Sequence, residues 1–99
     1  MTAQQIKFVK DSLQAAVSAG ASFNMNPTVI LAQAAFESGW GTSHLATGSN
    51  NFFGLTAYGA GNEYWHGGKT QVKTQRYSLD FRRYDTRENS FLDFARLIR

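Results

Sequence analysis

The chain has 99 residues, which is room for one domain and too little for two. Hydrophobic residues make up 42% and charged residues 17%, so we expect a folded core, and a disordered chain is excluded. Cysteine is absent, which excludes disulfides and thiolate metal sites. Ten Lys and Arg against seven Asp and Glu give a net charge of +3, which favours anionic polymers as partners.

No stretch of the sequence is typical of a membrane span or of an export signal. The apolar stretches are short and interrupted by polar residues, and the first ten residues lack an apolar core. We therefore expect no insertion into a membrane.

The first predicted element is an amphipathic helix. Thr2 and Gln5 have the spacing of a capping box, and apolar residues then recur at helical intervals. This pattern predicts a helix over residues 3–19 that ends at Gly20.

A second helix is predicted to follow directly. Asn26 before Pro27 favours helix initiation, because a polar N-cap and a proline in the first turn both suit that position. Gly39 is expected to end this helix, because glycine readily adopts the left-handed cap conformation.

The rest of the chain predicts loops, a small hairpin and a closing helix. Residues 39–68 are rich in Gly, Ser, Thr, Asn and aromatic residues, which is typical of loops, with a short helical turn over 42–46. Alternating β-branched and aromatic residues over 69–84 predict a β-hairpin. Asp85 with Glu88 has the spacing of another capping box and predicts a final helix. The predicted class is α+β, with most of the core supplied by helices.

Glu37 is the position most indicative of chemistry. It follows Ala34 by three residues and Ile30 by seven, which places it on the apolar side of the second predicted helix, in its last turn. Partial burial and the negative end of the helix dipole would both favour a protonated carboxyl there. Such a group suits general-acid catalysis, for example protonation of a leaving oxygen in a glycosidase. The spacing fits a solvated glutamate at a helix end equally well.

Three segments carry a resemblance to one known family. Residues 30–45, ILAQAAFESGWGTSHL, closely resemble the catalytic-helix motif of glycoside hydrolase family 73. Residues 50–55, NNFFGL, are similar to its second motif, and residues 81–98 are similar to its third. The first motif is long and specific, and all three occur in the family's order, so chance agreement explains the likeness poorly. The resemblance spans residues 23–99.

The resemblance implies a lysozyme-like fold, with a mainly helical core and a small β-hairpin lobe that flanks a substrate cleft. It also implies cleavage of β-1,4 bonds in the glycan strands of peptidoglycan, usually after N-acetylglucosamine, with Glu37 as proton donor. We expect no cofactor and no metal, because His44 and His66 lie far apart in the sequence without a carboxylate cluster at ligand spacing.

The second catalytic group is where the chain departs from the family. Family members often carry a carboxylate on the hairpin, in a Thr-Gln-Glu-like stretch, whereas Arg76 occupies that position here. Asp80 and Glu63 are the alternative carboxylates that could approach the cleft. A mechanism with Glu37 as the only protein acid is also open, in which the substrate's N-acetyl group or a muramyl hydroxyl attacks. Retaining, inverting and lytic transglycosylase routes all stay open at this point.

Aromatic and amide side chains of the middle region are candidates for contact with the glycan strand. Aromatic rings stack on the apolar faces of sugars, although packing within the protein explains the same residues equally well. Arg82, Arg83 and Arg87 are interpreted as a solvated face, with contact to the carboxylates of peptidoglycan as the alternative. The predicted substrate contacts are Trp40, Asn51, Phe53, Tyr58, Tyr64, Trp65 and Tyr77.

The sequence is compatible with three functions. The leading hypothesis is an enzyme that hydrolyses or transglycosylates peptidoglycan. A non-catalytic wall-binding module of the same fold is the main alternative, because Arg76 replaces an expected acid. A nucleic-acid-binding domain rests on charge and aromatic content alone, and we expect no nucleic-acid partner.

The sequence also carries expectations about organisation. Residues 1–99 are predicted to form a single, monomeric glucosaminidase domain. The family domain usually continues beyond this point, which makes Arg99 a candidate truncation site. Such an enzyme acts in the periplasm or cell wall. Without a signal peptide, it would be delivered as part of a larger protein, by a phage or by a secretion system.

Overall fold

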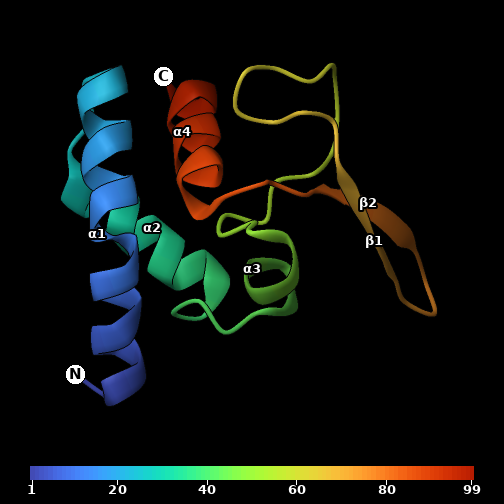
Figure 1. The fold of residues 1–99 in the computed structure, drawn as a ribbon. Coiled ribbons are helices and arrows are strands. Elements are labelled where there is room, and N and C mark those ends of the chain that lie inside the picture. The colour runs from blue at the N-terminus through green and yellow to red at the C-terminus, as the bar shows by residue number, and fades with distance from the viewer.

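The computed structural model describes residues 1–99 and contains four helices and one hairpin. Figure 1 shows the long first helix beside the last one, with the hairpin projecting from the opposite side of the molecule. None of the helices combines the length and apolar character needed to cross a membrane. The elements are α1 (Ala3–Phe23), α2 (Pro27–Ser38), α3 (His44–Ser49), β1 (Lys69–Lys73), β2 (Ser78–Arg82) and α4 (Arg87–Ile98).

Helix α1 begins as predicted and ends later than predicted. The Thr2 hydroxyl accepts the N–H of Gln5, and the Gln5 side chain accepts the N–H of Thr2, which completes the capping box. Gly20 does not end the helix. It is buried within it, where a Cβ would approach the Met25 carbonyl oxygen to 2.6 Å, so glycine permits close packing there. The left-handed cap is instead Asn24, with φ of 54°.

The predicted limits of α2 are confirmed, whereas those of the later helices shift. Asn26 caps α2 by accepting the N–H of Thr28, and Gly39 ends it with φ of 56°. The short α3 begins after Ser43 and extends beyond the predicted 42–46 turn. The predicted cap of α4 is wrong by one residue.

Thr86 is the residue that caps α4. Its hydroxyl accepts the N–H of Asn89 at 3.1 Å. The predicted cap, Asp85, instead lies 2.6 Å from Nδ1 of His66, in the loop before β1.

The predicted hairpin is confirmed, and a further segment extends it. Strands β1 and β2 pair antiparallel, and the Thr74 hydroxyl accepts the backbone N–H groups of Arg76 and Tyr77 in the turn. Residues 55–57 run along the free edge of β2, where the Ala57 N–H donates to the Asp80 carbonyl at 2.9 Å. This contact attaches the loop after α3 to the hairpin.

The hydrophobic core lies between α1, α2 and α4 and is closed by two aromatic side chains from the loop after α3. Phe91 of α4 is fully buried and contacts Phe52 and Phe53, with ring centroids 5.9 and 5.0 Å away. Phe53 also stacks on Phe94 at 4.0 Å. The α+β class with a mainly helical core is confirmed.

A buried ion pair joins the hairpin to α4. The Asp93 carboxylate has no exposed surface and accepts hydrogen bonds from Arg82 Nη1 at 2.6 Å and from the Tyr84 hydroxyl at 2.5 Å. Its other oxygen accepts from Asn62 and Arg96. The interpretation of Arg82 as part of a solvated face is therefore wrong, because this side chain is buried and paired.

The other two nitrogens of the Arg82 guanidinium also donate to groups of the protein. Nε donates to the Thr56 carbonyl at 3.1 Å and Nη2 to the Tyr58 carbonyl at 2.8 Å, while the group lies 4.2 Å from the ring centre of Trp65. Burial, followed by the hydrogen bond to Asp93, raises the pKa of Tyr84 far above its ordinary value. The phenol therefore stays a neutral donor to the carboxylate.

Replacement of this carboxylate tests the ion pair. We predict that Asp93→Asn lowers the free energy of unfolding by about 3 to 5 kcal/mol, because Arg82 is left as an uncompensated buried charge. Urea denaturation followed by circular dichroism measures the change. Asp80→Asn, at an exposed position of the same hairpin, is the control and should unfold near the wild-type urea concentration. Equal stability of both variants would contradict the role given to Asp93.

Candidate functional site

Glu37 lies in the last turn of α2 and is exposed, which contradicts the predicted partial burial. Ile30 and Ala34, on the same face of the helix, have no exposed surface because the neighbouring helices cover them. Glu37 lies further along the same face, beyond the part that the neighbouring helices cover. The only hydrogen bond to the carboxylate comes from Gln33 Nε2 at 3.3 Å. Helical periodicity therefore predicted the correct helix face for Glu37, but its prediction of partial burial is wrong.

The Glu37 carboxylate lies beside the loop that carries the NNFFGL segment. A Cβ built on Gly54 would stand 3.9 Å from Oε2 of Glu37, an ordinary contact distance. Gly54 has φ of 65°, a conformation that glycine adopts without strain. The first and second family-like segments therefore meet at the carboxylate.

Asn51 holds this loop in place. Its Nδ2 donates to the carbonyl oxygens of Leu55 and Arg82 at 3.0 and 2.9 Å, and its Oδ1 accepts the N–H of Leu55 at 3.1 Å. Arg82 belongs to the third family-like segment, so one amide side chain connects the second segment to the third. Asn51 is 1% exposed, and the prediction that it contacts substrate is wrong because its amide is already occupied inside the protein.

The predicted aromatic contacts divide into buried and exposed side chains. Phe53 and Trp65 are buried, the first against Phe94 and the second beneath the Arg82 guanidinium, with its indole N–H donated to the Gly68 carbonyl. Their proposed contact with sugar is therefore corrected to a role in packing. Tyr58 and Tyr77 are exposed and remain available to a ligand.

Two further predicted aromatic contacts are half-buried. Trp40 packs edge-on against Phe8 of α1, with ring centroids 6.0 Å apart, which favours the packing interpretation of this residue. Tyr64 packs against Phe23 at the other end of α1, with centroids 6.1 Å apart. Both rings thus pack against α1.

One exposed aromatic residue near Glu37 was not among the predicted contacts. Phe36, the neighbour of Glu37, is 81% exposed. Its position off the apolar side of the helix was the available signal, since the buried residues of α2 are Ile30, Ala34, Ala35 and Ser38.

The two candidate second carboxylates lie in different parts of the fold. Asp80 is exposed in the middle of β2, opposite Gln71 of β1. Glu63 lies in the loop that packs on α4 and on the end of α1, and its hydrogen bond is the main cause that raises the pKa of Tyr64. Neither forms a hydrogen bond with Glu37. Arg76, at the position where an acid was expected, lies in the exposed hairpin turn.

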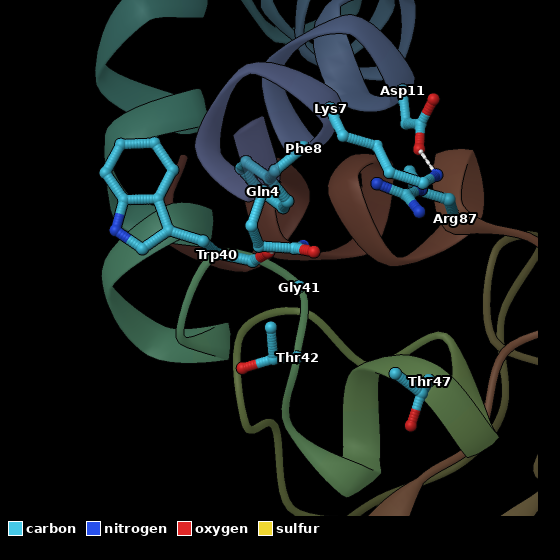
Figure 2. Close-up of a pocket in the computed structure, with 9 residues that line it drawn as sticks. All are labelled: Gln4, Lys7, Phe8, Asp11, Trp40, Gly41, Thr42, Thr47 and Arg87. Atoms are coloured by element: carbon cyan, nitrogen blue, oxygen red, sulfur yellow. Dashed lines mark hydrogen bonds and ion pairs between the residues drawn. The ribbon is translucent and has the colours of Figure 1, made fainter. Parts of the chain in front are cut away.

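The pockets of the surface do not include Glu37. The largest, shown in Figure 2, lies between α1, α3 and the loop that contains Trp40 and Thr42. A smaller apolar one lies between α1 and α2. The carboxylate thus occupies open surface beside Gly54, and the predicted substrate cleft is not found around it.

Comparison with known proteins assigns this arrangement to one family. The sequence profile of the glucosaminidase family, described as mannosyl-glycoprotein endo-beta-N-acetylglucosaminidase, matches residues 13–99. The peptidoglycan hydrolase FlgJ of Vibrio parahaemolyticus is 29% identical over 102 residues, which is 92% of this chain and 32% of that protein. The chain therefore spans about a third of the length of this curated relative.

Solved structures show the same fold. A peptidoglycan hydrolase from Sphingomonas is 32% identical, with a TM-score of 0.76 over 97% of this chain and 61% of that one. The glycoside hydrolase domain of Salmonella typhimurium FlgJ is 26% identical, with a TM-score of 0.77 over 95% of this chain and 60% of that one. These likenesses confirm the predicted lysozyme-like fold class.

The role of Asn51 can be tested without an activity assay. We predict that Asn51→Asp lowers the free energy of unfolding by at least about 2 kcal/mol, because two buried carbonyl oxygens would lose their donor and face an acceptor. Thermal and urea unfolding measure the effect. Gln75→Glu makes the same amide-to-acid change at an exposed position of the hairpin turn and should leave stability close to wild type. A wild-type transition for Asn51→Asp would refute the proposed anchor.

Proposed function

This chain belongs to the glucosaminidase family, and from that premise we propose that it cleaves β-1,4 glycosidic bonds in the glycan strands of peptidoglycan, with Glu37 as general acid. The observation that carries the proposal is the position of Glu37. It is the one carboxylate at the junction of the first and second family-like segments, and it is exposed to an incoming polymer.

The proposed role of Glu37 begins with proton donation. Its protonated carboxyl gives a proton to the oxygen of the bond that breaks, and the resulting carboxylate later takes a proton from the attacking water. A glycan strand lying over Glu37 and Gly54 would exclude water from the carboxyl, which favours the neutral form needed for the first step. Substrate binding thus supplies the burial that the free protein lacks.

The attack on the anomeric carbon is proposed to come from the substrate. Arg76 replaces the acid expected on the hairpin, and no other carboxylate shares a hydrogen bond with Glu37. The carbonyl oxygen of the sugar's own N-acetyl group can attack the anomeric carbon as the leaving oxygen is protonated. Water then opens the cyclic intermediate with help from Glu37, and the product retains its configuration.

Exposed aromatic side chains are proposed to hold the strand. Phe36 is adjacent to Glu37, whereas Tyr58 follows the segment that pairs with β2 and Tyr77 lies at the end of the hairpin turn. Aromatic rings at such exposed positions suit stacking on sugar faces. Because the substrate is a component of the cell wall, we propose that the protein acts there.

Removal of the proton at position 37 is the first test. Glu37→Gln preserves shape and removes the acid, so release of soluble fragments from purified cell walls should fall by at least ~10²-fold. Liquid chromatography with mass spectrometry measures the release. Glu63→Gln makes the same change in the loop before β1 and should retain activity. Near-unchanged activity of Glu37→Gln would overturn the assignment, and fragments from neither variant nor wild type would favour a wall-binding module.

The ends of the products separate hydrolysis from transglycosylation, and a variant at Asp80 tests whether that carboxylate is the attacking group. Attack by the N-acetyl group predicts fragments with reducing N-acetylglucosamine ends and a variant Asp80→Asn that keeps wild-type kcat. Mass spectrometry after borohydride reduction identifies these ends. Anhydromuramyl ends would show transglycosylase chemistry instead, and loss of kcat in Asp80→Asn would assign the second role to that carboxylate.

The space beside Glu37 offers a matched pair of glycines. Gly54 and Gly59 both have positive φ, of 65° and 78°, but only a Cβ at Gly54 would approach the Glu37 carboxylate. We predict that Gly54→Ala lowers cleavage several-fold more than Gly59→Ala, because its methyl group occupies space that the strand needs, while both variants share the same backbone strain. Equal cleavage rates for the two variants would contradict a substrate position next to Gly54.

A further inference from the structure

The largest pocket of the protein has no part in the proposed cleavage site. It has a volume of about 400 Å³, within the range of roughly 300 to 1,000 Å³ typical of ligand pockets. Figure 2 shows that it opens between the first half of α1 on one side and α3 on the other. Its lining mixes charged, hydroxyl, amide and aromatic groups, which is the chemistry of a polar ligand site.

Two cations line this pocket and have donors to spare. Arg87 lies 4.4 Å from the ring centre of Phe52 and donates Nη1 to the Ser12 hydroxyl at 2.6 Å, but it forms no ion pair. Lys7 pairs with Asp11 at 2.6 Å and keeps two further N–H groups. With two cations against one carboxylate, this part of the pocket favours an anion.

Asp11 competes with such an anion. The hydrogen bond from Lys7 lowers the pKa of Asp11 below its ordinary value, so this carboxylate stays ionised at neutral pH. The pair shows that a carboxylate oxygen fits against Lys7 in this position. A ligand carboxylate between Lys7 and Arg87 would meet donors from both.

The opposite wall offers acceptors. The hydroxyls of Thr42 and Thr47 donate their hydrogens to the carbonyl oxygens of Gly39 and Ser43, at 2.7 and 3.0 Å. Only their lone pairs therefore remain for a ligand. A ligand that donates N–H groups therefore suits the wall formed by α3 and the loop before it. On the α1 side, Gln4 donates one N–H to the Trp40 carbonyl at 3.0 Å and retains its carbonyl oxygen as a further acceptor.

Donors on one wall and acceptors on the other match the end of a peptide chain, which has a carboxylate next to an amide N–H. The side chains of Phe8 and Trp40 add apolar surface for a small aliphatic side chain. We propose that this pocket binds the free C-terminal carboxylate of a short peptide and, resting on the proposed function, that the peptide is a stem peptide of the peptidoglycan strand. The pocket thereby holds the substrate at a second point.

The probe is N-acetyl-D-alanyl-D-alanine, compared with its C-terminal amide and with acetate. Titration of the full chain, followed by ¹⁵N NMR, should shift backbone signals of α1 and of residues 40–47. The amide should bind at least about 10-fold more weakly, because charge-assisted hydrogen bonds to Lys7 and Arg87 are lost. Acetate that binds as tightly as the dipeptide would overturn recognition of a peptide, and equal binding of acid and amide would overturn recognition of the carboxylate.

Exposed side chains of α1 supply matched variants that leave the core intact. Lys7→Gln should weaken dipeptide binding by about 2- to 5-fold, whereas Asp11→Asn should strengthen it, because a competing negative charge is removed. Lys10→Gln removes the same charge from α1 outside the pocket and should bind like wild type. Equal effects of Lys7→Gln and Lys10→Gln would show that the net charge of the protein alone attracts the dipeptide, and would overturn the site.

Cleavage of glycan strands without peptides separates this proposal from the proposed function. Wild-type protein that cleaves such strands but gives no dipeptide-induced shifts would overturn the pocket and leave the glycosidase assignment intact. Protein that binds the dipeptide but cleaves neither bare strands nor cell walls would overturn the glycosidase assignment and, with it, the identification of the peptide as a stem peptide.

Discussion

The ion pair between Arg82 and Asp93 is the constraint on which the non-helical half of the molecule depends. A two-stranded hairpin has too little surface to form a core of its own, so it must be attached to the helices. Asp93 provides that attachment, because its carboxylate accepts hydrogen bonds from Arg82 of β2, from Tyr84 and from the loop residue Asn62. Removal of either charge leaves the other buried without compensation, which is far more costly than loss of an exposed pair.

The same strand that carries Arg82 also fixes the candidate active site. The backbone of Arg82 bonds to Leu55 and to the Asn51 side chain, and the loop so anchored places Gly54 against Glu37. Helix α4 thus fixes the position of β2, and β2 fixes the position of the loop. The loop in turn defines the space beside the Glu37 carboxylate. The peptide pocket, on α1, α3 and Arg87, is built from other contacts and can be changed separately.

Local signals in the sequence predicted local structure well. The capping residues Thr2 and Asn26, together with Gly39, act through neighbours in the chain, and α1 and α2 begin and α2 ends where these signals indicate. Burial of individual side chains was predicted poorly, because it depends on which other helices, strands and loops pack over each residue. Glu37 shares a helix face with Ile30 yet is exposed, and Arg82 resembles a surface charge yet is buried against a partner that follows it by 11 residues. The likeness to a known family supplied the proposed role of Glu37, which periodicity left undecided.

We propose that the exposed glutamate at the end of α2 becomes a general acid when a glycan strand covers it. A crystal structure of Glu37→Gln with a bound tetrasaccharide of the glycan strand tests this directly. We predict that the side chain at position 37 lies within about 3 Å of a glycosidic oxygen and that the strand passes over Gly54. A tetrasaccharide bound elsewhere on the protein, with position 37 still open to solvent, would contradict it.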